Sequence, residues 1–227
     1  MKNLYKAALR AVLGLASISA VNAAPYNGDL IIGLTEGSGN DVVYDLGAAS
    51  SLTGGETWDL SSILSGYDLS TISWGVIGTL NAGSPRTASS TTDGTTPPAN
   101  IPNLSAWGKN NTAISSIYQN FASAGMGQSI LITVSDDNSW NSQTISPSLT
   151  TQYANVYGNP NVVGTTSDSL YSILANNSAP TLLGNFNLDG TGMVTFNPVP
   201  EPSTYGLLAV AGLLGLSRFK SFGRKQA

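Results

Sequence analysis

Hydrophobic and polar residues alternate over several short stretches, a spacing typical of strands with one buried face. The clearest stretch is Thr71–Leu80, in which Ile72, Trp74 and Val76 alternate with small or polar residues. Two β-rich runs within residues 29–46 flank a connector rich in Gly, Ser and Asn, which predicts an antiparallel hairpin. The chain therefore begins its folded body with strands close together in sequence.

Three later segments extend this pattern. A strand is predicted at Ile130–Val134, and a final hairpin at 182–188 and 193–197 across a Gly-containing turn. The pattern predicts a mainly β fold, an antiparallel β-sandwich-like single domain with two or three short helices.

One stretch shows helical spacing instead, Asn111–Ala124, with Thr112 as its predicted N-cap and Gly125 as its stop. Its apolar residues fall at i, i+3, i+4 and i+7: Ile114, Ile117, Tyr118 and Phe121. Shorter helices are predicted at Leu149–Tyr157 and Ser169–Leu174. Between strands and helices, residues 81–103 are rich in small, hydroxylated and proline residues, and predict a long mobile loop within the single domain.

The first 23 residues have the organisation of a secretory signal peptide. Lys2, Lys6 and Arg10 precede an apolar segment too short for a stable membrane span. Val21 and Ala23 occupy the small-residue positions before a predicted cut after Ala23. The alternative is an N-terminal core helix. With residues 1–23 removed, the exported domain would span 24–198.

Residues 199–227 combine three features in a fixed order. The stiff Pro200-Glu201-Pro202 triplet comes first, because both prolines fix φ and favour extended geometry. An uncharged run from Tyr205 to Leu216 follows, shorter than the about 20 residues that a full span needs. Its larger apolar residues are Tyr205, Leu207, Leu208, Val210, Leu213, Leu214 and Leu216. The chain then turns basic, at Arg218, Lys220, Arg224 and Lys225, which predicts a cytoplasmic end.

Such a weak span favours a temporary inner-membrane anchor over a C-terminal helix packed on a soluble core, and the glycines in the run are poor for a soluble helix. The arrangement resembles the PEP-CTERM sorting signal of Gram-negative bacteria. The matching residues begin with Val199, Pro200, Glu201, Pro202, Ser203 and Thr204, followed by the apolar run and the basic tail. The resemblance implies contact with the secretion machinery and a membrane-embedded exosortase, removal of the tail, and delivery to the cell surface or extracellular matrix.

The block Gly28–Gly47, followed by Thr57–Gly78, also looks like the N-terminal body region of a subset of PEP-CTERM proteins, a region to which no activity attaches. Composition narrows the chemistry further. The chain has no Cys and no His, which excludes disulfides and the usual Ser-His-Asp, Cys-His and zinc sites. Apart from the two ends, Arg86 and Lys109 are its only bases, so nucleic acid is not an expected partner.

The acidic residues offer two candidate chemistries. Asp136, Asp137 and Asp189 lie in predicted turns, where paired carboxylates would suit a secreted hydrolase and oxygen ligands would suit calcium. No loop has the calcium-ligand spacing, and turn acids are most often solvated. We therefore predict no metal, no cofactor and no catalytic residue.

Aromatic residues offer a third possibility, because a planar ring can stack on a sugar face. Trp58, Trp107 and Trp140 lie in predicted loops or at loop edges, whereas Trp74 lies in the best strand. The sequence thus predicts a non-enzymatic structural or interaction protein of the cell surface or extracellular matrix. An exopolysaccharide-binding, lectin-like module is the first alternative and a secreted hydrolase the second.

Overall fold

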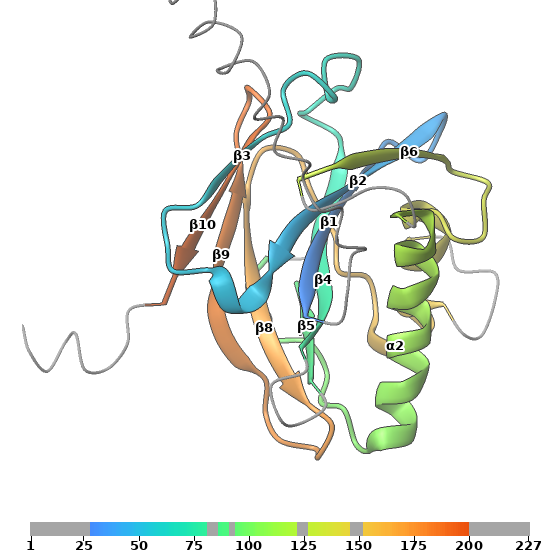
Figure 1. Ribbon diagram of the computed structural model, residues 1–227, viewed down its shortest axis with the longest axis vertical. Helices are drawn as coiled ribbons and strands as arrows, with labels where there is room; N and C mark the ends of the chain where they lie inside the picture. Colours follow the sequence, from blue (N-terminus) through green and yellow to red (C-terminus); the bar gives the residue numbers. More distant parts are fainter. Residues whose placement is uncertain (1–27, 81–85, 91–93, 122–126, 146–151, 200–227) are drawn as a thin grey trace, which may run out of the picture.

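The computed structural model describes residues 28–80, 86–90, 94–121, 127–145 and 152–199 (Figure 1). The predicted signal peptide and the apolar C-terminal run, with the helices expected there, lie outside these residues. The described part is mainly β, as the alternating pattern predicts.

Ten antiparallel strands run through the described residues. They are β1 (Asp29–Thr35), β2 (Asn40–Ala48), β3 (Thr57–Asp59), β4 (Ser73–Leu80), β5 (Arg86–Ser89), β6 (Ser129–Thr133), β7 (Val162–Val163), β8 (Ser167–Leu174), β9 (Thr181–Leu188) and β10 (Met193–Pro198). The predicted hairpins at both ends of the body are confirmed as β1–β2 and β9–β10, and the predicted strands at 71–80 and 130–134 as β4 and β6.

The strands follow the order β3-β10-β9-β8-β5-β4-β1-β2-β6, with β7 paired to β4. The first four form one half of a sandwich and the remaining five the other half, and the β5–β8 pairing joins the two (Figure 1). One core lies between the halves: Leu30 and Ile32 of β1 and Trp74 of β4 belong to the same cluster as Phe186 and Phe196 on the opposite half. This core makes the fold a sandwich.

A second core lies on the outer face of the five-stranded half. There Ile31, Val43 and Ile77 pack against helices α2 (Leu104–Tyr118), α3 (Trp140–Thr144) and α4 (Tyr153–Tyr157). Figure 1 shows α2 beside this half of the sandwich. Two short 3-10 turns, Ala49–Ser51 and Gln119–Phe121, complete the helical structure of the described residues. Because β1 serves both cores, its residues from Leu30 to Thr35 are all buried, in accordance with its near-continuous hydrophobic sequence.

Helix α2 begins seven residues before the predicted start, and this expectation was wrong. Asn103, rather than Thr112, is the N-cap: its side chain accepts from the Ala106 N–H at 3.0 Å. Thr112 lies inside the helix and its hydroxyl donates to the Gly108 carbonyl. The helix ends at Tyr118 rather than near Ala124.

Two further expectations are corrected. The segment 81–103 is not simply a loop, because β5 lies inside it and links the two halves through β4 and β8. Ser169–Leu174 is not a helix but the body of β8, where Leu170, Tyr171 and Ile173 are buried. Of the predicted helix at Leu149–Tyr157, the described part is helical only over Tyr153–Tyr157.

Candidate functional site

The tryptophans do not form a shared sugar-binding surface. Trp140, in α3, is fully buried, and its indole N–H donates to Asn161 Oδ1 at 2.7 Å. The expectation of an accessible ring is therefore wrong for Trp140. Trp58 is half-buried on β3 against Phe186, with 5.9 Å between ring centroids, while Trp107 is half-buried on α2. Those two rings belong to different layers of the fold.

Trp74 is buried, as its place in the best strand predicts. It is fully enclosed on β4, and its indole N–H donates to the Gly164 carbonyl at 2.8 Å. A buried indole usually finds such an acceptor, since an unpaired N–H in the core is costly.

The exposed carboxylates serve the turns in which they lie. Asp59, Asp68 and Asp189 each accept from the backbone N–H and the hydroxyl of the residue two positions later, at distances between 2.5 and 3.0 Å. These bonds stabilise the ionised form and lower the pKa of all three carboxyls, with the side-chain hydroxyl as the main cause. Asp136 caps its loop similarly, by accepting from the Asn138 N–H at 2.8 Å.

Glu56 shows the strongest effect of this kind. Its carboxylate accepts from the Thr53 and Gly54 N–H groups and from the Thr53 hydroxyl, at 2.6 to 3.0 Å. The backbone bond from Thr53 is the main cause, and the pKa of Glu56 falls to about 2. A carboxylate held in this way closes a loop and is a poor general acid.

Two buried acids in β2 were not singled out from the sequence. Asp41 Oδ2 accepts from the Asn141 N–H at 2.6 Å and so ties β2 to α3, and Asp45 Oδ1 accepts from the Gly47 N–H at 2.9 Å. Burial raises the pKa of both carboxyls. The signal was present, since two aspartates four residues apart within a hydrophobic strand point to the same face. That spacing also places them about 13 Å apart along the strand, which exceeds the separation used by glycosidases.

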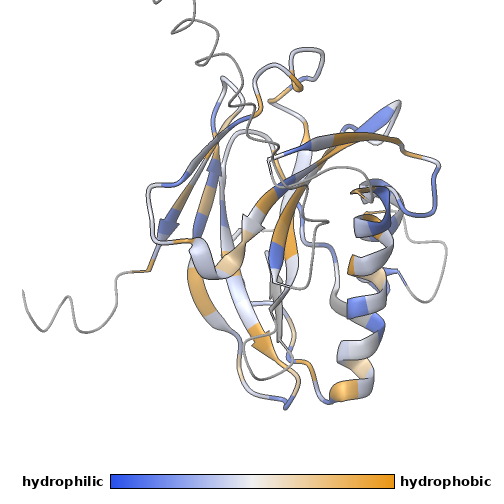
Figure 2. Ribbon diagram, in the orientation of Figure 1, coloured by the Kyte–Doolittle hydropathy of each residue, from blue (hydrophilic) through white to orange (hydrophobic). Residues whose placement is uncertain are grey.

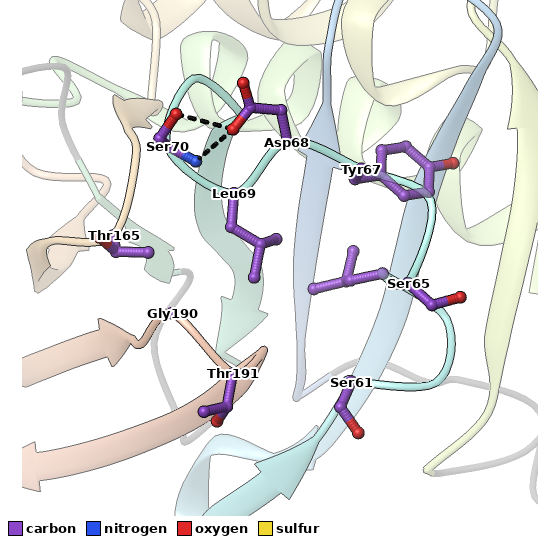
Figure 3. Close-up of a pocket in the computed structure, with 10 residues that line it drawn as sticks. Ser61, Ser65, Tyr67, Asp68, Leu69, Ser70, Thr165, Gly190 and Thr191 are labelled. Atoms are coloured by element: carbon purple, nitrogen blue, oxygen red, sulfur yellow. Dashed lines mark hydrogen bonds between the residues drawn. The ribbon is translucent and has the colours of Figure 1, made fainter.

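A hollow on the described surface has a volume of about 520 Å³ and lies between the loop after β3, Thr165 and the β9–β10 turn (Figure 3). Leu69 extends into the space between these loops (Figure 3). Five of the hydroxyls at its rim already donate within the fold: Ser61 to Asp59, Ser65 to the Ser62 carbonyl, Tyr67 to the Asn40 carbonyl, Ser70 to Asp68 and Thr191 to Asp189. The hollow is thus the meeting point of three capped turns.

The metal-ligand candidates remain separate. Asp136 and Asp137 follow β6 at one end of the strand order, and Asp189 lies in the β9–β10 turn of the opposite half. Among the described residues, no three acidic side chains are grouped closely enough to hold a metal ion.

The body leads directly into the C-terminal segment. β10 ends at Pro198, and the N–H of Val199 donates to the Leu183 carbonyl at 3.1 Å. Comparison with known families finds the PEP-CTERM protein-sorting motif at residues 198–224. The chain carries a PEP-CTERM sorting signal. The signal begins at Pro198, the last residue of β10. Its presence supports the conclusion that the protein is exported and sorted through exosortase.

The PEP-CTERM assignment concerns the tail alone, and the rest of the chain stands without a relative in these comparisons: no curated protein and no solved structure matches. None of the helices in the described residues is long and apolar enough to cross a membrane. The Pro-Glu-Pro triplet, the apolar run, the basic tail and the signal-peptide cleavage residues lie outside the described part, so their roles remain predictions.

Proposed function

We propose that this chain is a non-enzymatic structural or interaction protein of the cell surface or extracellular matrix, attached to a PEP-CTERM signal that exosortase removes. The observation that carries the proposal is the sorting motif at residues 198–224, joined without a spacer domain to the last strand of the body. The tail would hold the protein in the inner membrane only until it is processed.

The use of carboxylates in the body supports a structural role. Asp59, Asp68, Asp189 and Glu56 are engaged by their own turns, and their lowered pKa keeps them ionised. A glycosidase needs one carboxyl with a raised pKa facing another across a cleft. Asp41 and Asp45, whose pKa is raised, are buried in the same strand, and among the described residues they face no cleft with a second carboxyl. The acids thus support the proposal over a hydrolase.

The aromatic residues support a structural role over an exopolysaccharide-binding one. A lectin-like surface would need several accessible rings in a row on one face. Trp140 is in the core, Trp58 packs on Phe186, and Trp107 belongs to α2. A contact with matrix polysaccharide would then involve other groups and would be an accessory property.

The test is the intact mass of the protein recovered from the host cell surface and medium. We expect a mass that lacks both Met1–Ala23 and the segment beyond the Pro-Glu-Pro triplet. A mass that retains the tail would contradict processing by exosortase and would make the protein a permanently anchored one. Incubation of the recovered protein with the host's own purified exopolysaccharide should give no retention; saturable retention would favour the lectin-like alternative.

A further inference from the structure

The free edge of β6 lacks the features that usually protect an edge strand. Among the described strands, β6 is the last in the order and pairs with β2 alone. Natural edge strands are protected by charges, prolines, bulges or shortness. The opposite edge strand, β3, has three residues and ends at Asp59. By contrast, β6 reads Ser-Ile-Leu-Ile-Thr, without a charge, a proline or a glycine.

The register shows which residues of β6 direct their main-chain groups outward. The Val134 N–H donates to the Gly39 carbonyl, and the Asp45 N–H donates to the Gln128 carbonyl. Bonded and non-bonded pairs alternate in an antiparallel ladder, so Ile130 and Ile132 complete the bonds to β2. Ser129 and Leu131 therefore present their N–H and C=O groups to the open side, as Thr133 does its N–H, whereas the Thr133 carbonyl already accepts from the Asp136 N–H at 2.9 Å.

Side chains at this edge are hydrophobic and accessible. Leu131 is 56% exposed although it lies in a strand, and Ile130 is only partly buried against the second core. Figure 2 shows β6 as a hydrophobic strand at the margin of its half of the sandwich. A further strand paired with β6 would form hydrogen bonds with the open main-chain groups and would also cover Leu131.

The residue order of β6 is self-complementary. In an antiparallel pair of two identical strands centred on Leu131, Leu131 lies opposite Leu131, Ile130 opposite Ile132, and Ser129 opposite Thr133. Hydroxyl pairs and branched apolar pairs are favourable across strands. About four main-chain hydrogen bonds would join the two edges without using the Thr133 carbonyls, which are engaged in their own turns. The two Thr133 residues, after which the acidic loops begin, would lie at opposite ends of the pair, about 13 Å apart along the strands. This distance exceeds the screening length of about 8 Å at physiological salt.

We propose that β6 pairs antiparallel with β6 of a second copy of this chain, about a two-fold axis at Leu131. The five-stranded halves of the two copies then form one continuous sheet. The pairing depends on the folded body alone, so it holds whatever the protein does at the surface.

Cysteine cross-linking tests the pairing in the full chain exported by its host, because the natural sequence has no cysteine. Opposed residues of a bonded antiparallel pair have Cα atoms about 5.5 Å apart, within the range of a disulfide. Leu131→Cys should give a covalent dimer under mild oxidation. Leu104→Cys is the matched control, because Leu104 is 62% exposed on α2 and away from the edge. The dimer should form about a hundred-fold faster for Leu131→Cys, because pairing holds the thiols at an effective concentration near millimolar.

A second pair of variants tests the register. Chains carrying Ser129→Cys should cross-link poorly to one another but well to chains carrying Thr133→Cys. Cross-linking of Leu131→Cys no faster than that of Leu104→Cys would overturn the proposal. Self-cross-linking of Ser129→Cys at the rate of Leu131→Cys would overturn the antiparallel arrangement. An unchanged unfolding midpoint for each variant, measured by circular dichroism, establishes that each result comes from a folded chain.

Discussion

The contact between Gly33 and Trp140 yields the sharpest stability prediction. Gly33 lies in the centre of β1, facing the second core, and the indole of Trp140 covers it directly. A Cβ built at Gly33 would lie 1.8 Å from the nearest indole carbon and within 2.4 Å of two others. A rigid ring that also donates to Asn161 cannot move aside cheaply.

Gly33→Ala should therefore destabilise the protein, although alanine normally gains about 0.5–1 kcal/mol over glycine through lower chain entropy. Overpacking of a core costs about 1–3 kcal/mol. Because the added methyl group would overlap three ring atoms, we expect a cost near the upper end of that range. We expect a net loss of about 2 kcal/mol, or about 4–8 °C in Tm for a domain of this size. Chemical unfolding measures the free energy and thermal unfolding the Tm, both followed by far-UV circular dichroism.

The same substitution at Gly108 provides the control. Gly108 lies in α2, and a Cβ there meets nothing within 4 Å, so Gly108→Ala should stabilise the protein by about 0.5–1 kcal/mol. Trp140→Phe should cost less stability in the Gly33→Ala background than in the natural chain, since the smaller ring leaves room for the methyl group. A neutral or stabilising Gly33→Ala would refute the seating of Trp140 on β1.

Four further predictions concern other parts of the chain. Ser90→Ala should lower stability by about 2 kcal/mol in urea unfolding, because the buried Val76 N–H and Pro160 carbonyl lose the Ser90 hydroxyl; no loss would restore the view of 81–103 as a loop without packing. Glu56→Gln should lower the unfolding midpoint at pH 7. Because the folded pKa of Glu56 is depressed, the difference in midpoint from the natural chain should disappear as the pH falls from about 4.5 through about 2. A difference that persists at acid pH would contradict the loop-closing role of the ionised carboxylate. Asp45→Asn should raise the unfolding midpoint at pH 7, because burial raises the folded pKa of Asp45 and so disfavours its charged form. The difference in midpoint should disappear at lower pH, where the carboxyl of the natural chain is protonated. A lower midpoint of the variant at pH 7 would show that the charge is needed. Replacing Pro200 and Glu201 by alanine should leave unprocessed protein in the inner membrane, as fractionation would detect, whereas normal release would contradict sorting by the tail.

Local pairing explains what the sequence predicted well. The β1–β2 and β9–β10 hairpins join residues close in sequence, so alternation and turn residues suffice to place them. β8 is buried on both faces, and its clustered Leu170, Tyr171 and Ile173 imitate helical spacing. β5 was hidden by its short, hydroxyl-rich sequence, because its strand character comes from the neighbours β4 and β8.

The sites illustrate the same limit. Asn103 after Pro102 was a usable N-cap signal, but the stronger apolar spacing further along the chain obscured it. The burial of Trp140 depends on α3 folding back onto Gly33, a contact between distant segments that no local pattern contains. The presence of the sorting signal was predictable because such a motif is a contiguous segment that can be recognised without the fold.

Because the tail follows directly after Pro198, a force on the tail would act on the last strand, β10. Five residues separate Val199 from the apolar run at Tyr205, a tether of at most about 18 Å. A force applied to the tail would therefore act almost directly on β10. β10 pairs with β9 on one side and with β3 on the other. A force along β10 would therefore have to break the hydrogen bonds of both pairs, and could not peel β10 away as it could a strand at a free edge. If the tail anchors the protein as proposed, it would pull on the body through an interior strand, which should let the body withstand traction during export.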